Sequence, residues 1–127
     1  MSLRHAEALS MSDAITTAKL IIKQQAYESG CHASFMPKPL AGEDGSAMLL
    51  CQSLFDHDGN NVFWGEDDEK YHLSDIAKHY MAGILAHARE ISAITNPTVN
   101  SYKRITTGGD SVPQYATWGL RNRASMV

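Results

Sequence analysis

Cysteine is scarce in this sequence, whose 127 residues include two, Cys31 and Cys51. Two thiols are too few for the disulfide framework of a small secreted protein, so we expect a reduced, cytoplasmic setting. Long apolar runs are also missing. The longest extends from Ala47 to Cys51, whereas a membrane-spanning helix needs about 20 apolar residues. The sequence therefore argues against both a disulfide scaffold and a membrane protein.

An excess of basic residues is likewise absent, because 11 Lys and Arg stand against 14 Asp and Glu. This balance argues against binding to nucleic acid or to an anionic membrane. The charge is uneven, since residues 1–95 carry 7 basic and 13 acidic side chains and residues 96–127 carry 4 basic and 1 acidic. The four cations are Lys103, Arg104, Arg121 and Arg123. Arginine suits carboxylate and phosphate oxygens, although such cations more often serve solubility.

A hydrophobic content of 43% is typical of a globular protein, and the length suits one domain of about 100–150 residues. Apolar residues at helical spacing predict a first helix that begins at Ser10 or Ser12 and stops at Gly30. Residues 31–36 are expected to be extended because Pro37 follows them.

Residues 47–55 form an apolar run that predicts a buried strand. Residues 56–61 then predict a hairpin turn, with residues 62–64 as the partner strand. Ser74 is expected to cap a second helix, which ends at Asn96 and Pro97. This helix carries an apolar stripe, and short β-prone pieces follow it at residues 99–102 and 114–118. The order of elements predicts an α+β fold.

Spacing alone identifies no metal or nucleophile site. His79 and His87 are eight residues apart, and no His-Glu-x-x-His motif occurs. Cys51 lies within the apolar run, so a buried, inert thiol is the simpler interpretation. Gly108 and Gly109 follow two cations, but a glycine pair more often marks a turn than a phosphate site.

Three segments carry more information. Residues 35–40 read Phe-Met-Pro-Lys-Pro-Leu and lead to Asp-Gly-Ser-Ala-Met at 44–48. Residues 95–104 read Thr-Asn-Pro-Thr-Val-Asn-Ser-Tyr-Lys-Arg, and residues 118–123 read Trp-Gly-Leu-Arg-Asn-Arg. In this order they resemble glutamine synthetase, with similarity from about Leu9 to the last residue.

The resemblance implies part of a catalytic domain, truncated at both ends, whose fold is a curved antiparallel sheet with helices packed outside. The implied activity is an ATP-dependent ligase that joins glutamate to ammonia, or to another amine, through γ-glutamyl phosphate, with Mg²⁺ or Mn²⁺. It also implies a homo-oligomer with active sites between subunits. The metal-binding carboxylates of the family lie mostly upstream of this segment, with one downstream.

The family's site residues fall on seven positions of this chain. Those implied to bind the glutamate substrate are Asp44, Gly45 and Arg104, and those implied to bind ATP are Cys51, Ser53 and Arg123. Asp110 occupies the position of a catalytic glutamate that helps to deprotonate the ammonium ion.

Several of these positions depart from the family pattern. Where the family has Met-His-x-His-x-Ser, residues 48–53 read Met-Leu-Leu-Cys-Gln-Ser, so Leu49 replaces a metal-binding histidine and no metal ligand is expected there. Asp44 places a negative charge where a neutral amide would meet a carboxylate substrate. Asp110 is one methylene shorter than glutamate. The alternative to a ligase is therefore a catalytically inactive relative with a structural or ligand-sensing role.

Overall fold

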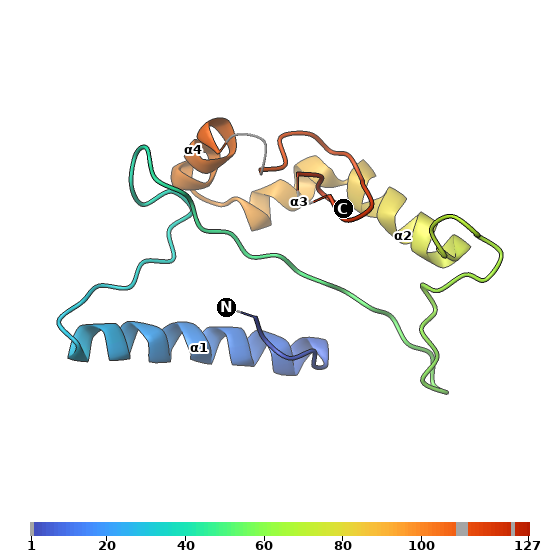
Figure 1. The fold of residues 1–127 in the computed structure, drawn as a ribbon, viewed down its shortest axis with the longest axis horizontal. Coiled ribbons are helices and arrows are strands. Elements are labelled where there is room, and N and C mark those ends of the chain that lie inside the picture. Colours follow the sequence, from blue (N-terminus) through green and yellow to red (C-terminus); the bar gives the residue numbers. More distant parts are fainter. Residues whose placement is uncertain (1, 109–111, 123) are drawn as a thin grey trace. The chain divides into compact units, whose positions relative to one another are not determined.

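A computed structural model describes residues 2–108, 112–122 and 124–127 of the chain. The chain divides into two compact units, residues 1–35 and 36–127. Helices account for the regular secondary structure of both (Figure 1).

The first unit contains one helix, α1 (Ala8–Glu28). Its N-terminus lies slightly before the predicted start, because the carboxylate of Glu7, rather than a serine, accepts hydrogen bonds from the amides of Leu9 (3.0 Å) and Ser10 (3.1 Å). These amides hold the pKa of Glu7 below its ordinary value. The predicted C-terminus is confirmed: Gly30 has a φ of 72°, and the amide of Cys31 donates to the carbonyl of Ala26.

The second unit contains α2 (Asp75–Ala86), α3 (Ala88–Thr95) and α4 (Val99–Thr107). The sequence predicted one helix from Ser74 to Asn96, and both of these boundaries are confirmed. The helix is nevertheless interrupted at His87, whose φ of −100° and ψ of 18° separate α2 from α3.

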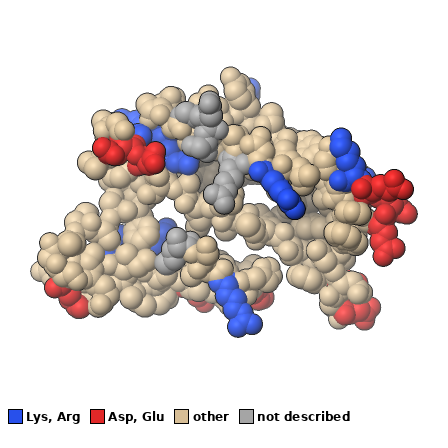
Figure 2. Space-filling view, viewed as in Figure 1, with Lys and Arg blue, Asp and Glu red and all other residues tan. Residues whose placement is uncertain are grey.

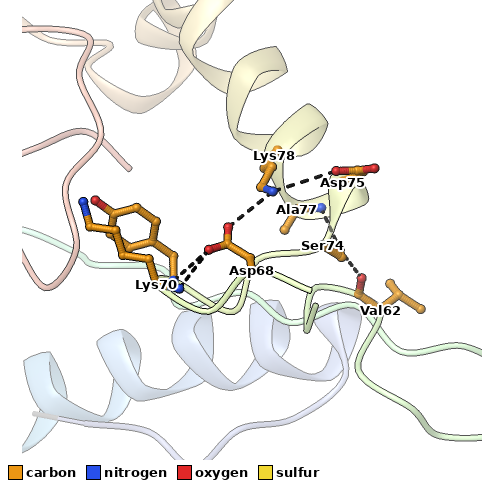
Figure 3. Close-up of polar contacts among 8 residues, drawn as sticks. Val62, Asp68, Lys70, Ser74, Asp75, Ala77 and Lys78 are labelled. Carbon is orange, nitrogen blue, oxygen red and sulfur yellow. Dashed lines mark hydrogen bonds and ion pairs between the residues drawn. The ribbon is translucent and has the colours of Figure 1, made fainter. Parts of the chain in front are cut away.

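The start of α2 is fixed by two polar side chains (Figure 3). The hydroxyl of Ser74 accepts from the amide of Ala77 (3.1 Å) and donates to the carbonyl of Val62 (2.6 Å). The carboxylate of Asp68 accepts from the amide of Tyr71 (3.0 Å) and pairs with the Lys78 ammonium (3.3 Å). The amide of Tyr71 first, and then Lys78, hold the pKa of Asp68 below its ordinary value. Together these bonds attach the 62–74 segment to α2.

Removing the Ser74 hydroxyl should weaken the attachment of the 62–74 segment to α2. Ser74→Ala loses the helix cap and leaves the Val62 carbonyl without its donor, at a combined cost of about 1–2 kcal/mol. We expect the Ala77 amide to exchange with solvent about tenfold faster in Ser74→Ala, as measured by hydrogen exchange of the 127-residue chain. Ser74→Thr keeps a hydroxyl and is the control. Equal exchange rates of the Ala77 amide in the unsubstituted and Ser74→Ala proteins would contradict the role of Ser74 as the helix cap.

The described residues form no β-strand, so the predicted antiparallel sheet is not confirmed. Two isolated bridges join Phe55 to Asn61 and Trp64 to Leu73. The first closes the predicted turn, in which Gly59 has a φ of 84°. Residues 47–54 lack the burial that was predicted and are exposed along their whole length.

The prediction that residues 99–102 are β-prone is wrong, because these residues form the first turn of α4. The hydroxyl of Thr98 accepts a hydrogen bond from the amide of Ser101 (3.2 Å) and so caps the helix. Residues 114–118, also predicted to be β-prone, form no strand.

Few apolar side chains are buried among the described residues. Ala77 and Val112 are the buried hydrophobic residues, at 4% and 6% exposure. Many large side chains remain exposed, among them Met48, Leu49, Leu50 and Leu54. No described helix combines the length and apolar composition needed to cross a membrane.

Candidate functional site

The loop of residues 37–46 lies beside α4 (Figure 1). It brings Gly45 to the side chain of Arg104. A Cβ atom placed on Gly45 would lie 2.5 Å from the carbonyl oxygen of Pro37 and 3.1 Å from Cδ of Arg104. Contacts this close require glycine at position 45. Two of the predicted substrate-binding residues, 59 positions apart in sequence, therefore lie against each other.

Two hydrogen bonds within the loop of residues 37–46 hold it closed. The amide of Ser46 donates to the carbonyl of Pro37 (2.8 Å), and the ammonium group of Lys38 donates to the carbonyl of Glu43. Asp44 lies within this closed loop and is exposed. Asp44 thus precedes Gly45 in the loop, with its side chain open to solvent.

Arg104 itself lies on α4 and is half-buried. Among the described residues, no carboxylate pairs with its guanidinium group. A partly desolvated guanidinium without a protein counter-ion favours the binding of an anionic ligand. The guanidinium group of Arg104 could therefore hold an anionic group.

Asn100 was not singled out from the sequence, although it lies within the same motif as Arg104. Its side-chain amide bonds to both peptide groups of Lys38. Nothing in the sequence pattern pairs these two residues, which are 62 positions apart.

The predicted ATP-binding residues Cys51 and Ser53 lie apart from this group, on the exposed 47–54 segment. Cys51 is exposed, so the expectation of a buried thiol is wrong. Their neighbour Gln52 accepts a hydrogen bond from the hydroxyl of Tyr80 on α2. Arg123 and the predicted catalytic residue Asp110 lie outside the described residues.

The described residues do not fit a divalent metal ion. Throughout residues 2–108, 112–122 and 124–127, no three His, Cys, Asp or Glu side chains are grouped so that they could hold one. Leu49, at the histidine position of the family, is 71% exposed and has no ligand atom. The described part of this chain therefore supplies no metal centre of its own.

The C-terminal segment folds back on residues of the second unit. The Trp118 ring meets the Tyr71 ring edge-on, with centroids 5.2 Å apart, and the amide of Gly119 donates to the carbonyl of Val127. Arg121 is exposed and has a φ of 54°. Within the second unit, the described Lys and Arg side chains on the face that Figure 2 shows lie in separate groups.

The chain matches, over residues 1–127, the family described as glutamine synthetase, catalytic domain. Curated glutamine synthetases of Mycolicibacterium smegmatis and Mycobacterium tuberculosis are each 50% identical to it over 127 residues. The glutamine synthetase of Thermococcus kodakarensis is 48% identical over 124 residues. The chain spans 28% of the length of the first two relatives and 27% of the third.

A solved structure described as "Apo GmaS without ligand" is 34% identical and superposes with a TM-score of 0.78. The superposition covers 95% of this chain and 27% of that structure. The three sequence segments that suggested the resemblance thus lie in a chain that matches one family along its whole length. The chain belongs to the glutamine synthetase family.

Proposed function

We propose that this chain is part of the catalytic domain of an ATP-dependent ligase that joins glutamate to ammonia, or to another amine, through γ-glutamyl phosphate. In this proposal the 127 residues are a single segment of that domain, which continues beyond both ends. The observation that carries the proposal is the contact of Gly45 with the half-buried Arg104, because it forms a place for a substrate carboxylate. Membership of the family supplies the reaction class.

In this site Arg104 binds a carboxylate of glutamate through two parallel N–H···O bonds. Gly45 allows the loop to approach the arginine this closely, since a side chain there would collide with the Pro37 carbonyl and with the Arg104 side chain. Asp44 would repel a second carboxylate, so we propose that it weakens glutamate binding relative to the neutral amide of the family. Asp110 takes the proton of the ammonium ion, and Arg123 faces the phosphates.

ATP and Mg²⁺ or Mn²⁺ belong to the proposed reaction, but the described residues contain no group of side chains that could hold the metal ion. We place the metal-binding carboxylates in parts of the protein outside this segment. Cys51 and Ser53 are proposed to contact the nucleotide from the exposed 47–54 segment. No step of the reaction is assigned to a metal held by this chain.

The exposed apolar side chains of the 47–54 segment support a second element of the proposal. Met48, Leu49, Leu50 and Leu54 would be covered if this segment paired as a strand with other parts of the protein. We therefore propose that the segment contributes to a curved antiparallel sheet, with helices outside. From the family we further propose that the protein is a cytoplasmic homo-oligomer whose active sites are shared between identical subunits.

Leu49 favours a second candidate function, an inactive relative with a structural or ligand-sensing role. Leucine has no ligand atom, so the metal site would lack one of its donors. The loss of one ligand can reduce activity or abolish it, depending on the ligands that remain. The two functions differ in whether glutamine is formed.

The test uses the Mycolicibacterium smegmatis glutamine synthetase in which this chain replaces the segment that it matches, referred to below as the replacement enzyme. We expect it to form glutamine, about 10- to 100-fold more slowly than the parent enzyme, because one metal ligand is missing. Leu49→His in the same protein should recover most of this loss. No glutamine formation by an assembled replacement enzyme, restored by Leu49→His, would favour the inactive relative. No activity in either protein would contradict the proposal.

A further inference from the structure

One side chain connects the loop of residues 37–46 to α4 by a reciprocal pair of hydrogen bonds. The amide of Lys38 donates to Oδ1 of Asn100 (2.7 Å), and Nδ2 of Asn100 donates to the carbonyl of Lys38 (2.8 Å). Both residues are half-buried. A carboxamide is suited to this role because it carries a donor and an acceptor side by side, which aspartate, serine and leucine do not. The loop is therefore attached to the helix at one residue, Lys38, through its amide and its carbonyl.

The attachment point and the substrate-binding residue lie on the same face of α4. Asn100 and Arg104 are four residues apart in the helix, and such residues are neighbours on its surface. Along the loop, Pro37 precedes the attachment point and its carbonyl accepts from the amide of Ser46. The distance between Gly45 and Arg104 is thus set through a short chain of contacts that begins at Asn100.

We propose that Asn100 is a positioning residue, which holds the loop of residues 37–46 on α4 and so keeps Gly45 against the side chain of Arg104. Its role in substrate binding rests on the proposed function, whereas its role in placing the loop does not. Asn100 contacts neither the substrate nor the reacting atoms. It acts on glutamate binding through the separation of the two residues that contact the substrate.

The first experiment measures the loop directly in the 127-residue chain. We expect the amides of Lys38 and Ser46 to exchange with solvent about tenfold faster in Asn100→Ala. The Lys38 amide loses its acceptor on Asn100, and the Ser46 amide is protected only while the loop stays closed on the Pro37 carbonyl. Asn60→Ala is the matched control, since the Asn60 side chain bonds within its own turn, to Asp56. Unchanged exchange at Lys38 and Ser46 would overturn the proposal.

The second experiment separates positioning from general stability in the replacement enzyme. Asn100→Ala should raise the KM for glutamate about tenfold and leave kcat and the KM for ATP within about twofold. Asn100→Gln keeps both hydrogen-bonding groups and should recover part of the loss. An equal fall of all kinetic parameters, or a normal KM for glutamate, would show that Asn100 does not position the substrate residues.

A failure of the proposed function can be distinguished from a failure of the positioning role by measuring glutamate binding without turnover. If the unsubstituted replacement enzyme forms no glutamine, calorimetry with glutamate gives the same comparison through the dissociation constant. About tenfold weaker glutamate binding in Asn100→Ala supports the positioning role even without turnover. Equal binding by the two proteins would overturn it.

Discussion

Arg104→Lys is expected to raise the KM of the replacement enzyme for glutamate about 10- to 100-fold. Arginine presents two parallel donors to a carboxylate, whereas the ammonium group of lysine is a compact point charge. Losing one of two charge-assisted hydrogen bonds costs about 1.5–3 kcal/mol. The effect should fall on glutamate and leave the KM for ATP nearly unchanged, which steady-state kinetics with each substrate varied in turn will measure.

The matched control for this substitution is Arg89→Lys. Arg89 lies on α3 and is exposed, so the same chemical change there should leave both KM values unaltered. Wild-type values for glutamate in Arg104→Lys would show that Arg104 does not bind the substrate carboxylate. A change confined to ATP would instead assign this arginine to the nucleotide.

The helix ends of this chain were predictable because they depend on local chemistry. Ser74 caps α2 as expected, Asn96 ends α3 before a proline, and Gly30 ends α1 in the left-handed conformation. Each signal involves residues within one or two turns of the boundary. The start of α1 was missed because a glutamate, a less common cap than serine, supplies the acceptor at Glu7.

The predicted strands depended on partners that the sequence could not supply. Residues 47–54 have the apolar composition of a buried strand, yet among the described residues nothing covers them. Residues 99–102 are β-prone by residue type, but the Thr98 cap starts a helix there. In both places the context, rather than the propensity, decides the structure.

The candidate site was predictable only in part. The motif identified Gly45 and Arg104, and the structure places them in contact. The two hydrogen bonds between the Asn100 side chain and Lys38 were not predictable, because these residues are 62 positions apart and no sequence pattern pairs them. The sequence motif thus indicated two residues of the candidate site, and the structure added the contact of Asn100 with the loop.

The 127-residue chain on its own is expected neither to bind Mg-ATP measurably nor to form glutamine. The triphosphate of ATP carries several negative charges, and the family's chemistry offsets them with metal ions held by carboxylates and a histidine. The described residues provide no such group, and the histidine position is Leu49. The cations Arg104 and Arg121 would then meet the nucleotide without metal ions.

Cations of this kind attract polyanions only weakly at physiological ionic strength, because salt screens exposed charges beyond about 8 Å. We therefore expect calorimetry of the isolated chain with Mg-ATP to give heats that do not saturate and that disappear as salt is added. The replacement enzyme provides the positive control, since it contains the rest of the catalytic domain. Saturable, magnesium-dependent binding of the isolated chain in the micromolar range would show that these 127 residues already form a nucleotide site.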